Sequence, residues 1–301
     1  MTLCIAAECE YRGFPAIVLL ADSRSQTGNI AQPDLMIVSD DANKVREFKK
    51  TTVLLAGSHA RAFELSTACK PAIQEFTETD TKAEDLDIAV TDFLQKLRVA
   101  ARAKKREIVQ NFVENSTGIP HSDFIKLPSD NYLETWNDIR RLNLGADILI
   151  SHVKHEPVIV RMDRWGDAHW EHNYGAIGNG AEIARAILGI QRWDPSGQHG
   201  LFYYQTDIRV PLQECVFRLF EAHQVAHKSN PSSVGPSFQL QVLMARHRGE
   251  VKTEILGQLG FLCAEKLKIP KCSVATDPNR LLFKVRLLDT DSDLDEEPDE
   301  L

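Results

Sequence analysis

The chain has 301 residues, of which 43% are hydrophobic, so it can build one large core or two small ones. Its formal net charge is −8, but the last thirteen residues, DTDSDLDEEPDEL, carry eight acids and no base, which leaves the other 288 residues near neutral. A near-neutral body argues against nucleic-acid binding, which needs a basic face, and no apolar run is long enough to span a membrane.

The charge and cysteine patterns also bear on the chain's surroundings. We expect residues 289–301 to be a solvated, disordered tail, because like charges repel and little apolar surface is available to bury; a docking tail is the alternative. The start, MTLCIAAECEYR, lacks the basic region of a signal peptide. Six scattered cysteines without a CxxC pair favour reduced thiols and a cytoplasmic location.

The first predicted elements form a hairpin. Thr2–Glu8 and Ala16–Asp22 are apolar strand patterns, and the turn residues Tyr11–Pro15 separate them. Their continuous apolar runs predict burial on both faces. A loop is expected over Ser25–Asp34.

Further short strands lead into a helical region. The strand patterns are Leu35–Val38, Val45–Phe48 and Thr51–Ala56, the last ended by Gly57. Apolar residues then recur at helical spacing, and the expected helices and loop are His59–Phe76, the long basic-edged stretch Ala83–Val113, a loop over Asn115–Asp130 and a short helix over Tyr132–Leu142. The Lys104-Lys105-Arg106 cluster indicates a solvated helix face rather than an anion site.

The second half of the chain returns to strands and then to helices. The expected elements are strands at Ala146–His152, Pro157–Asp163 and His169–Tyr174, helices at Ala181–Ile190 and Leu212–Lys228, and a strand at Ser237–Arg246. The signals over Val251–Leu288 are too weak to arrange. Segregated runs of strands and helices predict an α+β fold in which helices cover packed sheets.

The second residue of the chain is suited to an unusual kind of catalysis. Removal of Met1 would make Thr2 the N-terminal residue, with its α-amino group held covalently near its own hydroxyl. An α-amino group has a pKa near ~7.7–8.0, so a large share is neutral at cellular pH and can act as a general base. Thr2 would then combine nucleophile and base in one residue.

A nucleophile of this kind needs supporting groups, and the sequence offers three. Lys44 can supply a nearby positive charge, and Asp22, at the end of the neighbouring strand, can hold that charge beside Thr2. Gly57, between a strand and a helix, is suited to donate a backbone N–H to an oxyanion. Because a buried lysine is costly without an acid, the Asp22–Lys44 pairing is the assumption to test.

Together these pieces resemble the proteasome β-subunit family of N-terminal nucleophile (Ntn) hydrolases, including the bacterial proteasome-like peptidases. The matching segments are TLCI at the start, IVLLADSR with Asp22 and Arg24, ANKV with Lys44, LLAGSHARA with Gly57, GAIGNGAEIARAIL and SSVGPSFQLQVL. They cover roughly residues 2–80 and 145–246. The order and spacing of the pieces carry the resemblance.

The resemblance implies a four-layer αββα sandwich of the Ntn-hydrolase type and cleavage of amide bonds by Thr2. It also implies that Asp22 and Lys44 support the nucleophile, that Arg24 assists them, and that the Gly57 N–H forms the oxyanion hole. No metal or organic cofactor is implied. Family members assemble into multimers, so we expect a homo-oligomer that acts on peptide or protein substrates; whether an unfoldase assists it stays open.

The sequence departs from the family pattern at two supporting positions. Asn179 stands where the family has a Ser that shuttles a proton, and an amide cannot relay a proton as a hydroxyl does. Asn230, Ser233 and Gly235 match the family's late Asp…Ser…Gly element only if one extra residue is allowed, with Asn230 in the place of Asp.

We therefore expect one Ntn-hydrolase domain over residues 2–288, with two additions whose roles the sequence leaves open. One is an inserted or extended helical segment over about 95–145, and the other is a C-terminal extension from about 247. The first hypothesis is a threonine-type endopeptidase. The alternatives are a non-catalytic assembly subunit, favoured by Asn179 and Asn230, and an amidase or transpeptidase that uses the same nucleophile. A metal site at His169 and His172 is disfavoured, because residues three apart on a strand face opposite sides.

Overall fold

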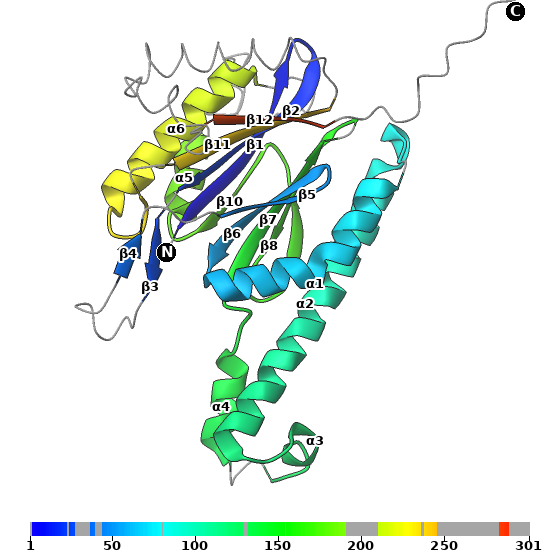
Figure 1. Cartoon of the computed structure of the whole chain (residues 1–301), viewed down its shortest axis with the longest axis vertical. Coiled ribbons are helices and arrows are strands. Elements are labelled where there is room, and N and C mark those ends of the chain that lie inside the picture. Colours follow the sequence, from blue (N-terminus) through cyan, green and yellow to red (C-terminus); the bar gives the residue numbers. More distant parts are fainter. Residues whose placement is uncertain are drawn as a thin grey trace, which may run out of the picture.

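The computed structural model describes residues 2–22, 24–27, 37–39, 44–79, 81–128, 132–153, 155–190, 210–235, 238–245 and 283–288. Within them, helices and two five-stranded sheets form an α+β fold (Figure 1). The expectation for the acidic tail 289–301 lies outside the described residues, as do most of the C-terminal extension and most of the segment between 28 and 43.

The first sheet is built around the predicted hairpin, which is confirmed. Its strand order is β10 (Tyr174–Gly178), β1 (Leu3–Tyr11), β2 (Phe14–Asp22), β11 (Phe238–Ala245) and β12 (Phe283–Leu288). All neighbours are antiparallel except β11 and β12, which are parallel. The hairpin turns at Arg12 and Gly13, both with positive φ, which matches the twist of the strands it joins.

The second sheet is antiparallel throughout. It has the order β5 (Val45–Phe48), β6 (Thr51–Gly57), β7 (Ala146–Val153), β8 (Pro157–Met162) and β9 (Ala168–Glu171). A separate two-stranded sheet pairs β3 (Ser25–Thr27) with β4 (Ile37–Ser39). Strand β3 replaces the start of the loop expected over residues 25–34, and β4 overlaps the strand expected over Leu35–Val38.

One predicted strand is wrong in an informative way. The segment His169–Tyr174 contains the end of β9 and the start of β10, and these strands belong to different sheets. Between them Asn173 has φ 68°, a left-handed conformation that ends an extended strand. The chain therefore crosses from the second sheet to the first within this segment.

Helices cover the outer side of each sheet (Figure 1). Their bounds are α1 (His59–Glu78), the short 3₁₀ turn η2 (Ala83–Asp85), α2 (Leu86–Thr117), α3 (His121–Phe124), α4 (Leu133–Arg141), α5 (Ala181–Ile190) and α6 (Leu212–Ser229). The short helix α3 replaces part of the loop expected over residues 115–130. Figure 1 shows the far half of α2 extending away from the sheets together with α3 and α4.

Three buried apolar clusters hold these elements together. The first joins β1 and its neighbours to α5 and α6 and includes Leu3, Ile5 and Leu219. The second joins the other sheet to α1 and α2. The third contains residues of both sheets, such as Leu19 and Leu149, so the two sheets face each other. Each buried aliphatic side chain contributes roughly 1.5–3 kcal/mol, so the sheets hold the chain's start firmly in place.

Two bulk properties can be checked on the described part of the chain. No helix within it combines the length and apolar character that crossing a bilayer requires. Cys4, Cys9, Cys69 and Cys215 are free and buried. Cys263 and Cys272 lie outside the described ranges.

Candidate active site

The start of β1, the end of β2 and the start of β5 meet at one buried point. Because Cys4 lies opposite Ala21 in the hairpin, the next position places Asp22 beside Leu3, close to Thr2. Lys44 comes directly before β5, and its carbonyl accepts a hydrogen bond from Leu55 N at 2.9 Å. The register of one hairpin and one strand pair thus sets the positions of the three polar side chains.

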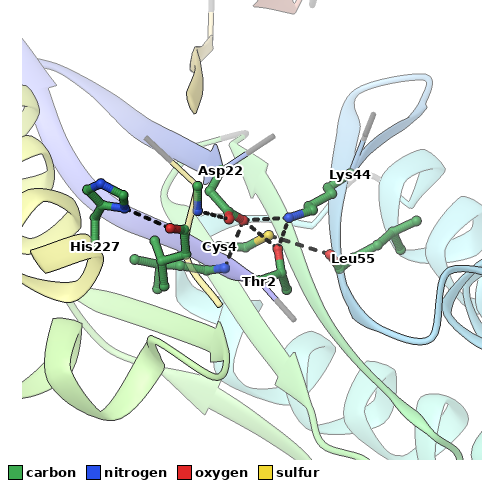
Figure 2. Close-up of polar contacts among 9 residues, drawn as sticks. Thr2, Cys4, Asp22, Lys44, Leu55 and His227 are labelled. Carbon is green, nitrogen blue, oxygen red and sulfur yellow. Dashed lines mark hydrogen bonds and ion pairs between the residues drawn. The ribbon is translucent and has the colours of Figure 1, made fainter. Parts of the chain in front are cut away.

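Thr2, Asp22 and Lys44 form a closed set of contacts, here called the buried ion cluster (Figure 2). Thr2 Oγ1 donates to Asp22 Oδ1 at 2.5 Å, and Lys44 Nζ lies 2.5 Å from the same oxygen. Lys44 Nζ also donates to Thr2 Oγ1. The pairing that the sequence required is therefore present, and the hydroxyl touches both charges.

The Asp22 carboxylate is almost fully buried, and both of its oxygens accept hydrogen bonds. Besides Thr2 and Lys44, its Oδ1 accepts from Leu3 N at 2.9 Å, and its Oδ2 accepts from Gly235 N at 2.8 Å. Asp22 is 1% exposed and Lys44 is 6% exposed. Buried charges are tolerated only when they are paired and hydrogen-bonded. Separating these side chains would therefore be costly, and the cluster is held in one arrangement.

Cys4 lies next to the buried ion cluster but is not reactive. Burial raises the pKa of its thiol to about 12, although the positive charge of Lys44 acts in the opposite direction. The thiol is therefore protonated at neutral pH and is a poor nucleophile. Its Sγ contacts Leu55 O at 3.5 Å, which links β1 to β6 across the two sheets.

Gly57, the expected oxyanion donor, occupies a position that only glycine fits. Its φ is +95°, and an added Cβ would lie 2.6 Å from Gly145 O and 2.9 Å from Ala146 Cα. Leu55 N points to Lys44 O, and N–H groups two residues apart in an extended strand point the same way. The Gly57 N–H therefore faces the side of β6 on which Lys44 lies.

The turn after β10 packs directly against Thr2. An added Cβ on Gly178, whose φ is +91°, would lie 2.2 Å from Thr2 O, and Gly180 N approaches the same carbonyl at 3.4 Å. Asn179, between these two glycines, is exposed. The predicted glycine turn is thus a support for the backbone of Thr2, and Asn179 stands at the surface beside it.

Of the late element Asn230, Ser233 and Gly235, Gly235 contacts the buried ion cluster. Gly235 N contacts Asp22, whereas Asn230 builds the turn itself: its carbonyl accepts from Ser233 N at 3.1 Å and from Val234 N at 3.0 Å. Ser233 is buried, and Arg24 Nη1 donates to Pro231 O within the same turn. Asn230 and Arg24 therefore shape the loop that carries Gly235.

Sequence reasoning missed two groups behind this loop. His227 Nδ1 lies 2.7 Å from Val234 O, and His223, one turn earlier on α6, is fully buried. The available signal was a pair of histidines at i and i+4 near the end of α6, directly before the turn that carries Gly235.

A metal site finds no support among the described residues. No three of their His, Cys, Asp or Glu side chains are grouped so that they could hold an ion. His169 and His172 are both exposed, and His172 lies outside any strand.

Comparisons with known proteins give structural likeness only. No protein-family model and no curated protein sequence matches the chain. One similar solved structure is eukaryotic HslV from Trypanosoma brucei, at 16% identity over 81% of this chain and 99% of that chain, with a TM-score of 0.46. Another is the Gly-1 mutant of Anbu from Hyphomicrobium sp. strain MC1, at 15% identity over 80% of each chain, with a TM-score of 0.45. Both are proteasome-like proteins, the group that the sequence resembles, and at these values we draw nothing from them about activity.

Proposed function

We propose that this chain is a threonine-type peptide or amide hydrolase of the proteasome-like kind, with Thr2 as its nucleophile after Met1 is removed. One observation carries the proposal: the Thr2 hydroxyl contacts the ammonium group of Lys44 and the carboxylate of Asp22 in one buried cluster. A threonine with a merely structural role in a strand does not require two buried charges around its hydroxyl.

In the proposed reaction the free α-amine of Thr2 takes the proton from Oγ1 as the oxygen attacks an amide carbonyl. Because amine and hydroxyl belong to one residue, their separation is set covalently, and the pKa range of α-amines suits a base at neutral pH. The C–N bond of the substrate then breaks, and the α-ammonium returns the proton to the leaving amine. An acyl group stays on Oγ1.

Lys44 and Asp22 supply the electrostatics of this step. The Lys44 ammonium donates to Oγ1 and stabilises the negative charge that develops there as its proton leaves. Asp22 accepts from Lys44 and from two backbone N–H groups, so neither charge needs to reorganise. The Gly57 N–H is the proposed donor to the carbonyl oxygen, and a water, activated by the same amine, hydrolyses the acyl-enzyme.

Access to Thr2 depends on processing. Thr2 is 3% exposed in the chain that carries Met1, which is bonded to the Thr2 nitrogen. The residues beside it, Gly57, Ser58 and Asn179, are exposed. We infer that removal of Met1 frees the amine, and that a substrate approaches Thr2 between the β6–α1 junction and the β10–α5 turn.

The same proposal includes the wider properties that the family resemblance implies. We infer that residues 2–288 form one Ntn-type domain of four αββα layers, with the helical segment over about 95–145 as an addition. We also infer a cytoplasmic homo-oligomer that acts on peptide or protein substrates. The helices outside each sheet and the apolar contact between the sheets support this architecture.

Covalent labelling tests the proposal. Purified protein, with its N-terminus read by intact mass, is treated with an epoxyketone or β-lactone probe, and fluorogenic peptide amides are assayed in parallel. We expect one probe per chain, bound at Thr2, in the form that lacks Met1. Thr2→Ala should lose the label, while Thr2→Ser, which keeps a hydroxyl, should retain it.

Two outcomes would favour the alternatives. Absence of label and of hydrolysis in chains that lack Met1 would contradict the enzyme and favour an assembly subunit, in line with the exposed Asn179 that replaces a relay hydroxyl. Labelling combined with transfer of the acyl group to an added peptide amine, in preference to water, would identify a transpeptidase.

A further inference from the structure

One peptide unit connects helix α6 to the buried ion cluster. The carbonyl of Val234 accepts a hydrogen bond from His227 Nδ1 at 2.7 Å, and the N–H of the next residue, Gly235, donates to Asp22 Oδ2 at 2.8 Å. These two groups belong to the same planar amide, on opposite sides of it. Figure 2 shows the continuous line of contacts from His227 through this amide to Asp22 and Lys44.

The chemistry of the partners fixes the direction of the first contact. A carbonyl oxygen only accepts hydrogen bonds, so His227 must carry its proton on Nδ1. The second contact runs the same way, because the Gly235 N–H donates and the carboxylate accepts. Hydrogen bonds aligned in series polarise one another, so a donor on the Val234 carbonyl strengthens the donor that faces Asp22.

Packing prevents this amide from turning away. Val234 is 0% exposed, and its Cγ2 lies 2.9 Å from where a Cβ on Gly180 would stand, next to Leu3. On the other side, the ring of His227 stacks parallel to that of His223, with centroids 6.5 Å apart. His223 is 0% exposed and burial lowers its pKa to about 4, so it is neutral at neutral pH and brings no charge to the stack.

The Gly235 contact has a distinct task at the carboxylate. Thr2, Lys44 and Leu3 all donate to Asp22 Oδ1, whereas Gly235 N donates to Oδ2. The torsion that rotates a carboxylate is soft. A donor on the second oxygen therefore determines which way the carboxylate plane faces, and so how Asp22 holds Lys44 against Thr2.

We propose that His227 is a positioning residue for the reaction at Thr2: through the Val234–Gly235 amide it orients and polarises the donor that fixes the Asp22 carboxylate. This inference rests on the proposed function. His227 touches neither the reacting hydroxyl nor a substrate in this arrangement, and it acts on the buried ion cluster through the loop alone.

The test compares two replacements of His227 in chains whose free Thr2 terminus is verified by intact mass. His227→Leu removes the donor, and His227→Asn places an amide N–H near the position of Nδ1. Loss of one hydrogen bond of about 1 kcal/mol corresponds to about fivefold to tenfold in rate. We expect His227→Leu to lower kcat on a fluorogenic peptide amide by about that factor with little change in KM, and His227→Asn to recover most of kcat.

Controls separate this effect from simple loss of structure. The thermal midpoint of each variant is measured, and Lys228→Ala, an exposed neighbour on the same helix, should match wild type in kcat and KM. If His227→Leu does not fold, His227→Ala takes its place. Equal kcat in wild type and the donor-free variant, or equal losses in the Leu and Asn variants, would overturn the proposal.

A second readout keeps this test apart from that of the proposed function. With ¹⁵N-glycine labelling, the Gly235 amide proton reports the strength of its hydrogen bond whether or not the chain is an enzyme. We expect an upfield shift in His227→Leu and a wild-type position in His227→Asn. An unmoved Gly235 resonance in the Leu variant would refute the relay, whereas failed probe labelling of wild type would refute only the hydrolase.

Discussion

Two groups of lysine–carboxylate pairs can be compared, one in the buried ion cluster and one on the surface of helices α1 and α2. Lys44 Nζ lies 2.5 Å from Asp22, and Lys96 Nζ lies 2.6 Å from Asp92 and 2.7 Å from Glu75. The side chains of the first pair are 7% and 0% exposed, while those of Lys96 and its two partners are 37% to 60% exposed.

The difference shows that distance alone does not determine what an ion pair does. Hydrogen bonds to Asp92 and Glu75 raise the pKa of Lys96, but water competes for every one of these groups and screens the charges. The side chains of Lys44 and Asp22 are almost fully buried, so solvent compensates poorly for a lost partner and each charge depends on the other. The buried pair can therefore hold a hydroxyl in place, whereas the surface pairs mainly keep the helices solvated.

The largest expected effect comes from breaking the buried pair. Lys44→Met leaves the Asp22 carboxylate buried without a counter-charge, and we expect the free energy of unfolding to fall by about 3–5 kcal/mol. Probe labelling of Thr2 should be lost as well. Urea unfolding at neutral pH measures the first effect and intact mass the second. A loss of stability no greater than that of a surface lysine variant would contradict the comparison.

A smaller effect is expected from the glycine beside the cluster. Gly57→Ala forces a Cβ against the backbone of β7 and keeps a residue at φ +95°, which costs about 1–3 kcal/mol or more. Gly118, at the end of α2, also has a positive φ, but nothing lies within 4 Å of an added Cβ there. Gly118→Ala is therefore the matched control, and equal losses of stability for the two variants would show that the close approach at Gly57 is unimportant.

The comparison can be sharpened with a buried neutral group. Burial lowers the pKa of His223 from 6.5 to about 4, so the unfolded chain binds a proton between these pH values that the folded chain does not. The contribution of His223 to the free energy of unfolding is thus fully present above pH 6.5 and is lost as the pH falls toward 4. Between pH 7 and pH 5 the free energy of unfolding falls by about 2 kcal/mol from this cause. We expect His223→Leu to depend less steeply on pH, measured by urea unfolding at both values. Parallel pH profiles for the two proteins would oppose this assignment.

The smallest effect is expected at the surface. Lys96→Met removes a lysine whose pairs with Asp92 and Glu75 are exposed, and such pairs often contribute nothing measurable. We expect an unchanged urea midpoint and unchanged probe labelling. A drop that approaches that of Lys44→Met would show that burial is not what separates the two regions.

Much of the fold was predictable because apolar patterns are local. The hairpin of β1 and β2 follows from two apolar runs around a turn, and α1, α5 and α6 follow from helical spacing. The β9–β10 break was missed because a strand pattern does not state which sheet a strand joins. The pairing of β12 with β11 was also missed, since weak signals separated by a long stretch of chain give no register.

The side-chain contacts of the site were predictable from the sequence, but its backbone contacts were not. Asp22 and Lys44 were expected beside Thr2, and their contacts are present. The Gly235 N–H and the Val234 carbonyl were beyond reach, because every residue except proline carries the same backbone donor and acceptor and only the loop's path selects one. For the same reason Asn230 was expected near the nucleophile, while its bonds serve the turn.

The crossing between Glu171 and Tyr174 sets a mechanical limit on the molecule. Three Cα steps span at most about 11 Å, and facing sheets pack about 10 Å apart, so this link has almost no slack. This short link holds the two sheets together at one edge, so an opening motion at the opposite edge would use the link as a hinge. Two glycines inserted after His172 would lengthen the link and free that motion without altering a single residue around Thr2.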